Sequence, residues 1–135
     1  LELLGVTNAD LSILPEYCRL AANMCHVPLI HSSPVVGRDA FRTGTGVHAA
    51  AIMKAAAKGD AWLADRIYSS VPASLVGREQ VIEIGPMSGQ SNVRHWLQKH
   101  GYDDDESLVE RIFDASKKTD HTLTEEELED LCRDA

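Results

Sequence analysis

The chain has 135 residues, a hydrophobic content of 44% and a formal net charge of −8 at pH 7. This length fits one compact domain or two small packed subdomains, and the aromatic content of 5% predicts a core built mostly from aliphatic side chains. Residues 103–135 carry 13 acidic against 4 basic side chains, a net charge of −9, which argues against nucleic-acid binding.

The first predicted helix ends near Cys25, because apolar residues recur at helical spacing up to that position. Thr7 or Asn8 is a candidate N-cap for this helix. Pro15 fits only a first helical turn, so the regular helix is expected to begin near Leu14 if neither cap is used.

The three cysteines, Cys18, Cys25 and Cys132, are an odd number without a C-x-x-C pair. This favours reduced thiols and a cytoplasmic location over a disulfide framework. We expect Cys18 and Cys25 to pack in the core from one helical face. His26 and His31 lie nearby, but the spacing matches no standard zinc-ligand set, so the sequence predicts no metal site here.

Three glycines, Gly37, Gly44 and Gly46, accompany an alanine-rich stretch that predicts a helix from Gly44 to Lys58. Glycine permits backbone geometries that other residues avoid, and the free N–H groups of a helix start favour anions. His48 lies in the first turns of this helix, where an imidazole with a pKa of about 6.5 suits proton transfer. The stretch alone favours a buried, hydrogen-bonded structural histidine over a catalytic one.

The apolar side chains of this helix are expected in the core. They are Val47, Ile52 and Met53. Asp60 is predicted to cap a short helix that ends near Tyr68. The 20 residues between His48 and Tyr68 are enough for the chain to turn back and bring the two side chains together. A phenol in that position can orient water or an oxyanion.

Residues 81–84 have the composition of a short strand, for which the region around Ile67 is the expected partner. Ser88 is predicted to cap a helix over residues 90–100. Residues 85–89 also fit a phosphate-cradling turn, but no Lys-Ser/Thr pair follows them, so helix capping is favoured.

Two more helices are predicted, one starting at residue 104 or 105 and one opened by a capping box at residues 124–127. Between them, Asp114, Ser116 and Glu125 fall at positions 1, 3 and 12 of a calcium loop. Lys118 stands where an oxygen ligand is needed, and Thr119 stands where the sharp turn requires glycine. The sequence therefore predicts a charged turn between helices and no calcium site.

Together these patterns predict a mainly α-helical fold with at most a short β ribbon. We expect two small helical subdomains, residues 1–82, which contain His48 and Tyr68, and residues 83–135, an acidic three-helix unit. A (β/α)₈ barrel is excluded, because it takes roughly 250 residues. The sequence opens on Leu in the middle of a pattern, without a signal peptide, so we expect a piece of a longer polypeptide.

Three sequence motifs occur in order along the chain. They are G-x-x-A-F-x-x-x-x-G-[VI]-H (Gly37, Ala40, Phe41, Gly46, Val47 and His48), the stretch from Tyr68 to Val76-Gly77, and Ile84-Gly-Pro-Met-Ser-Gly89, with Val27-Pro28 upstream. In this order they resemble the segment that follows the catalytic barrel in 2-isopropylmalate synthases, and homocitrate and citramalate synthases share it. The resemblance covers most of the chain.

The resemblance implies an acyltransferase that condenses acetyl-CoA with a 2-oxo acid, in the first place 2-oxoisovalerate for leucine biosynthesis. A divalent metal in the barrel holds the oxo acid in such enzymes. This chain lacks the barrel and its His-x-His pair, so the fragment alone is expected to be inactive and to bind no metal. In relatives, which are homodimers, the first post-barrel subdomain closes over the active site of the partner subunit.

By this resemblance His48 is a proton carrier or water activator, and Tyr68 is an orienting hydroxyl, both acting in trans. The substrate-binding positions are then Gly44, Thr45 and Gly46. A subdomain that closes over the active site in this way acts as a lid, and it would increase the reaction rate through proximity and electrostatics.

The chain departs from relatives where they often carry histidine, serine and Gln-Asp around the Gly-Ile-His motif. Here those positions are Thr43, Thr45, Ala49 and Ala50. The oxo acid therefore stays open, and a homocitrate or citramalate synthase fragment is the alternative. The competing class is a stand-alone helical interaction module whose alanine face docks another helix.

Overall fold

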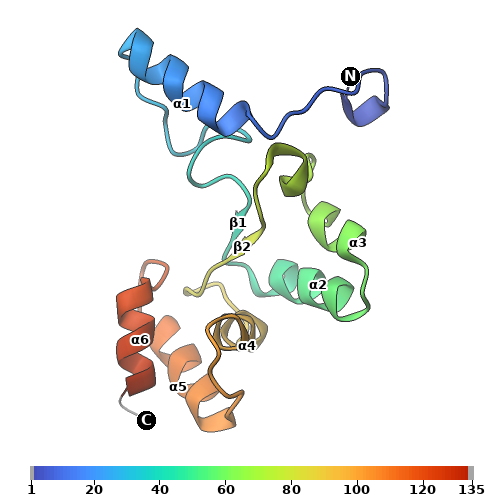
Figure 1. The fold of residues 1–135 in the computed structure, drawn as a ribbon. Coiled ribbons are helices and arrows are strands. Elements are labelled where there is room, and N and C mark those ends of the chain that lie inside the picture. Colours follow the sequence, from blue (N-terminus) through green and yellow to red (C-terminus); the bar gives the residue numbers. More distant parts are fainter. Residues whose placement is uncertain (1, 134–135) are drawn as a thin grey trace.

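A computed structural model describes residues 2–133 (Figure 1). The elements of this range are the helices α1 (Leu14–Cys25), α2 (Gly46–Ala57), α3 (Ala61–Arg66), α4 (Gln90–Lys99), α5 (Glu106–Ser116) and α6 (Glu125–Arg133), the strands β1 (Arg42–Thr43) and β2 (Val81–Ile82), and 3₁₀ turns at Glu2–Leu4 and Ala73–Val76. This mainly helical architecture with its short two-stranded sheet confirms the predicted fold class and is not a barrel.

The two strands pair in parallel, with Arg42 opposite Val81. The expected pairing of β2 with the region around Ile67 is wrong. The N–H of Ile67 donates to the carbonyl of Leu63 at 2.9 Å and ends α3, so it is not available to a sheet. Helices α2 and α3 form the connection between the strands, as parallel pairing requires a crossover.

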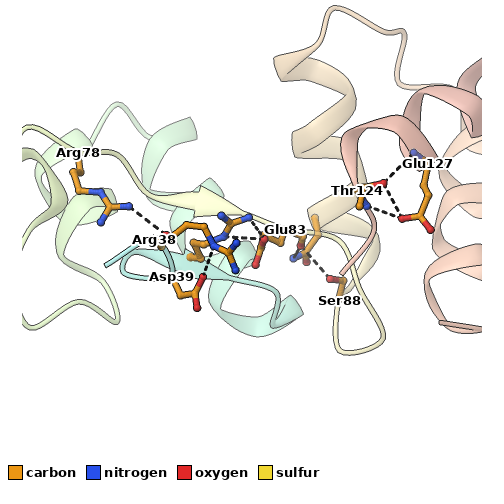
Figure 2. Close-up of polar contacts among 9 residues, drawn as sticks. Arg38, Asp39, Arg78, Glu83, Ser88, Thr124 and Glu127 are labelled. Atoms are coloured by element: carbon orange, nitrogen blue, oxygen red, sulfur yellow. Dashed lines mark hydrogen bonds and ion pairs between the residues drawn. The ribbon is translucent and has the colours of Figure 1, made fainter. Parts of the chain in front are cut away.

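Several predicted helix starts are confirmed. Asp60 and Asp105 each accept a hydrogen bond from the backbone N–H three residues on, at 2.9 and 3.1 Å. Thr124 and Glu127 form the predicted capping box, because the Glu127 carboxylate accepts from the Thr124 N–H at 2.8 Å and the Thr124 hydroxyl accepts from the Glu127 N–H at 3.3 Å (Figure 2).

Helix α4 begins at Gln90, as predicted, but its N-cap is Gly89, so the predicted cap at Ser88 is wrong. The Asn92 side chain accepts from the Gly89 N–H at 3.1 Å. The buried Ser88 hydroxyl instead accepts from the Gly85 N–H at 2.9 Å and donates to the Gly44 carbonyl at 2.8 Å. Ser88 therefore joins the turn before α4 to the segment before α2.

Buried apolar side chains gather in two clusters. The first contains Ala49, Ile52 and Ile82, and the second contains Ile84, Val93, Trp96, Leu97, Leu108, Val109, Ile112 and Leu128. Ile82 and Ile84 thus belong to different clusters, although only one residue separates them. The division into residues 1–82 and 83–135 stays a prediction.

The expectation that Val47 lies in the core is wrong, since its side chain is 70% exposed. At about 100° per residue it lies on the opposite side of α2 from buried Ala49. Ile52 is buried and Met53 packs against the first cluster, as predicted.

Helix α1 begins at Leu14 with Pro15 in its first turn, so Thr7 and Asn8 are not its caps. The helix projects away from the other elements and buries none of its residues (Figure 1). Cys25 is therefore exposed, and the predicted core packing of this cysteine is wrong.

Within residues 2–133, the helices are too short or too polar to cross a lipid bilayer.

Candidate functional site

The side chains of His48 and Tyr68 lie against each other. Their ring centroids are 3.9 Å apart, and the ring planes differ by 23°. His48 comes from the first turn of α2 and is half-buried, whereas Tyr68 follows α3 and is 59% exposed. The structure thus brings the two predicted catalytic residues together, because α3 folds back along α2. Their catalytic roles remain predictions.

His48 and Tyr68 border a cavity of about 150 Å³. The other lining residues are Phe41, Arg42, Thr43, Ile52, Ile67, Ser69 and Gln80, and no carboxylate is among them. The polar lining groups are neutral or cationic and most can donate hydrogen bonds, which suits a carbonyl or an oxyanion. Drug-sized ligands occupy pockets of about 300–1,000 Å³, so this cavity is too small to enclose a ligand of that size.

Two lining residues have backbone conformations that are unusual for side chains with a Cβ atom. Phe41 has φ +65° and Tyr68 has φ +61°, both in the left-handed region. Such conformations cost on the order of 1–3 kcal/mol each and persist only where surrounding contacts hold them. The cavity wall is therefore held in place by other residues.

The predicted substrate-binding residues do not line the cavity of His48 and Tyr68. Gly44 and Thr45 border a separate cavity of about 290 Å³ whose other walls are residues 85–87 and 120–122. Gly46 packs against the backbone of Gly89, where an added Cβ atom would lie 2.6 Å from the Gly89 nitrogen. Close packing against Gly89 thus explains why position 46 is a glycine. A substrate-binding role for Gly44, Thr45 and Gly46 remains a prediction.

Arg78 holds the loop before β1, a role that the sequence did not reveal. Its Nη1 donates to the carbonyls of Gly37 at 2.6 Å and Val35 at 3.1 Å, and its guanidinium lies 5.4 Å from the centre of the Phe41 ring. Its Nη2 donates to the Arg38 carbonyl at 3.4 Å (Figure 2). In the sequence, the one indication of this role is that Arg78 directly follows the Val76-Gly77 pair of the second motif.

Arg42 and Glu83 form an ion pair beside the sheet. The Arg42 Nε donates to the Glu83 carboxylate at 2.9 Å, and Nη2 contacts the same oxygen (Figure 2). The hydrogen bond to Glu83 raises the pKa of Arg42, so the pair stays charged. It fastens β1 to the residue that follows β2.

His121 was also missed, and it lies in the turn between α5 and α6. Its ring nitrogens contact the carboxylates of Asp120 at 3.1 Å and Glu127 at 3.3 Å. Hydrogen bonds to these two partners raise the pKa of His121. The imidazole is on the wall of the cavity that Gly44 and Thr45 border.

Among residues 2–133, no group of three or more His, Cys, Asp or Glu side chains is arranged to hold a metal ion. The chemistry that the described residues offer at the cavity is proton transfer by an imidazole and hydrogen bonding by a phenol.

No family model matches the chain. Over 102 residues it is 31% identical to a homocitrate synthase of Pyrococcus horikoshii, which covers 76% of this chain and 26% of that protein. It is 28% identical to an (R)-citramalate synthase of Aquifex aeolicus over 122 residues, covering 86% of this chain and 21% of the relative. With a 2-isopropylmalate synthase of Acetivibrio thermocellus it shares 30% identity over 113 residues, which is 83% of this chain and 20% of the relative.

The chain spans about a fifth to a quarter of the length of these curated relatives. The same group of synthases matches most of the chain each time, and the three sequence motifs had indicated this group. The chain belongs to the family of 2-isopropylmalate, homocitrate and citramalate synthases.

Proposed function

We propose that this chain is the part of an acyl-CoA-dependent synthase that follows the catalytic barrel, and that it acts as a lid. In this proposal residues 1–82 close over the active site of the partner subunit in a cytoplasmic homodimer, and residues 83–135 form the second subdomain. The observation that supports this proposal best is that His48 and Tyr68 stack against each other and border a cavity whose lining contains no carboxylate.

The reaction joins the methyl carbon of acetyl-CoA to the keto carbon of a 2-oxo acid, after which water hydrolyses the thioester. His48 would carry the proton or activate that water, since an imidazole titrates near neutral pH. The Tyr68 hydroxyl would orient the water or the thioester oxygen. Gly44, Thr45 and Gly46 are the substrate-binding residues in this proposal, and of these Gly44 and Thr45 border the neighbouring cavity.

A divalent metal would polarise the keto carbonyl of the oxo acid in such an enzyme. The described residues of this chain offer no ligand set that fits such an ion. The metal would therefore be held by the barrel, and we expect this chain by itself to be inactive. The 2-oxo acid that we propose first is 2-oxoisovalerate, with the homocitrate and citramalate reactions as alternatives.

The exposed apolar surface of the N-terminal part supports a covering partner. Between residues 3 and 30, ten large hydrophobic side chains are exposed, including Tyr17 at 63% and Met24 at 73%. Soluble proteins rarely leave large apolar patches in water, and such patches commonly mark interfaces. In this proposal the catalytic barrels of the dimer cover this surface.

The proposal is tested by measuring thiol release from acetyl-CoA with a panel of 2-oxo acids, using the full-length protein that contains this chain. The His48→Ala variant is expected to lower kcat by about 10²–10⁴-fold, the usual contribution of a general acid or base. His31→Ala is the matched control, because His31 is exposed and outside the cavity. Wild-type turnover in the His48→Ala variant would overturn the proposed function.

The exposed face of α1 also favours the second class, a stand-alone interaction module. The reading frame that encodes the chain separates the two classes. A metal-binding barrel encoded directly upstream of Leu1 supports the synthase, whereas a start codon at that place supports the module.

A further inference from the structure

The loop that carries Tyr68 connects α3 to the 3₁₀ turn at Ala73–Val76 and needs support. Because Tyr68 has φ +61°, its backbone is strained by roughly 1–3 kcal/mol relative to ordinary conformations. The phenol ring is 59% exposed, so core packing does not fix it. Polar contacts to the loop must therefore set the position of the ring.

Asp65 closes the loop at its two ends. One carboxylate oxygen accepts from the Ala73 N–H at 2.9 Å, and the other accepts from the Ser74 hydroxyl at 2.6 Å. These bonds fix where the loop begins and ends. They do not contact the residues adjacent to Tyr68.

Next to Tyr68, the Ser69 N–H donates to the Arg66 carbonyl at 3.0 Å, and Gln80 makes the side-chain contact to Ser69. Its Nε2 donates to the Ser69 hydroxyl at 2.6 Å and to the Asp65 carbonyl at 3.3 Å. The following residue, Val81, is anchored to the sheet because its N–H donates to the Phe41 carbonyl at 2.8 Å. The amide of Gln80 thus links the loop to the residue that precedes β2, and β2 pairs with β1, whose residues Arg42 and Thr43 line the cavity.

We propose that Gln80 is a positioning residue that holds the Tyr68 ring in its stacked place over His48. Gln80 acts through Ser69 and lines the same cavity as both rings. It belongs to neither buried cluster, so its removal leaves both cores intact. Without the amide donor the loop relaxes toward ordinary backbone angles, and the phenol moves away from the imidazole.

The first test reads the ring stacking directly, by ¹³C–¹H correlation spectroscopy of the histidine-labelled full-length protein. The Tyr68→Ala variant removes the ring current of the phenol, and the chemical-shift change that this causes at the His48 ring defines the full displacement. We expect Gln80→Ala and the nearly isosteric Gln80→Glu, which lacks the amide donor, to give at least about half of that displacement. Glu79→Ala, a change at the exposed neighbouring residue, is the matched control and should leave the signal in place.

The double variant Gln80→Ala with Tyr68→Ala separates positioning from a general structural effect. If Gln80 acts through Tyr68, the second substitution adds no further displacement of the His48 signal to that of Tyr68→Ala alone. A lower melting temperature in Gln80→Ala without movement of the His48 signal would overturn the proposal, as would equal displacement by Glu79→Ala.

The second test is kinetic and rests on the proposed function. In the full-length enzyme, Gln80→Glu should lower kcat by about tenfold with little change in KM, and should have no further effect in a Tyr68→Ala background. A change in KM alone would contradict a positioning role. The two proposals fail separately, because full activity in His48→Ala overturns the catalytic role while the spectroscopic result still decides the position of the ring.

Discussion

At the scale of single residues, two glycines with the same predicted role differ in their surroundings. A Cβ atom on Gly46 would lie 2.6 Å from the Gly89 nitrogen and 3.0 Å from its Cα, both of them backbone atoms that cannot rotate away. A Cβ atom on Gly44 would meet only the Thr122 methyl group, at 3.9 Å. The close approach of two chain segments therefore requires glycine at position 46 and not at position 44.

Gly46→Ala is expected to destabilise the protein by about 1–3 kcal/mol, the usual cost of overpacking. Gly44→Ala, the matched substitution, should change the free energy of unfolding by less than about 0.5 kcal/mol. Urea denaturation followed by circular dichroism measures both. Equal losses of stability in the two variants would contradict the close packing of Gly46 on Gly89.

His121 predicts a pH dependence of stability. Because Asp120 and Glu127 raise its pKa in the folded state, the protonated form stabilises the fold. This contribution is complete below the unfolded value of about 6.5 and is lost as the pH rises through the higher folded value. The pKa values of both carboxyl groups are lowered, by hydrogen bonds that include those to His121, so both stay ionised across this window.

We therefore expect His121→Gln to lower the urea midpoint at a pH of about 5.5 and to have little effect at about 8.5. His31→Gln is the control, because His31 is exposed and, among residues 2–133, its ring forms no ion pair with a carboxylate. If His121→Gln lowered the urea midpoint equally at both pH values, the charge of His121 would not contribute to stability.

The polar surroundings of the candidate site were the part that the sequence could not predict. The positions of His48 and Tyr68 followed from motifs, and their contact required only that α3 fold back along α2. Gln80 and Arg78 act through side-chain hydrogen bonds to segments that lie earlier in the sequence, 11 residues away for Ser69 and 41 for Gly37. Such bonds leave no periodic pattern in the chain, so only the folded structure reveals them.

At the scale of elements, the helices are set by local signals. Asp60, Asp105 and Thr124 begin helices where the sequence predicted them, because a cap acts on a backbone N–H only a few residues away. The partner of β2 could not be predicted, since a two-residue strand carries no alternating pattern to specify its register. Val47 and Cys25 were assigned to the core because they are apolar residues of predicted helices, but the sequence of a helix does not show which of its faces finds a partner.

The packing of α4 gives a prediction at this scale. Leu97 is fully buried in the second cluster, so Leu97→Ala should lower the free energy of unfolding by about 2–5 kcal/mol. Leu20→Ala on α1, where the side chain is 54% exposed, is the matched control and should cost less than about 0.5 kcal/mol. A comparable loss at Leu20 would show that α1 is packed against the chain.

At the scale of the whole molecule, apolar surface and charge are separated. Ten exposed large hydrophobic side chains lie between residues 3 and 30, whereas 13 of the 21 acidic residues lie in residues 103–135. The two ends therefore meet water in different ways, and only the acidic end is suited to remain solvated.

We expect the 135-residue chain to bind the dye ANS through the N-terminal surface. A triple serine substitution of Tyr17, Leu20 and Met24 should reduce the dye fluorescence severalfold, because these side chains are exposed on α1. Val47→Ser, which removes an isolated exposed side chain on α2, is the control. Unchanged fluorescence in the triple variant would exclude α1 as the dye-binding surface.

The hydrogen bond from Ser88 to Gly44 belongs to a chain of polar contacts that begins at α5. The ammonium of Lys117 at the end of α5 donates hydrogen bonds to the carbonyls of Pro86 and Ser88. The Ser88 hydroxyl in turn donates to the carbonyl of Gly44, which lies four residues before His48. These hydrogen bonds connect the end of α5 to the segment that precedes α2, and His48 lies in the first turn of α2. The start of the helix that carries His48 is therefore joined to the C-terminal helices through polar contacts as well as through the chain.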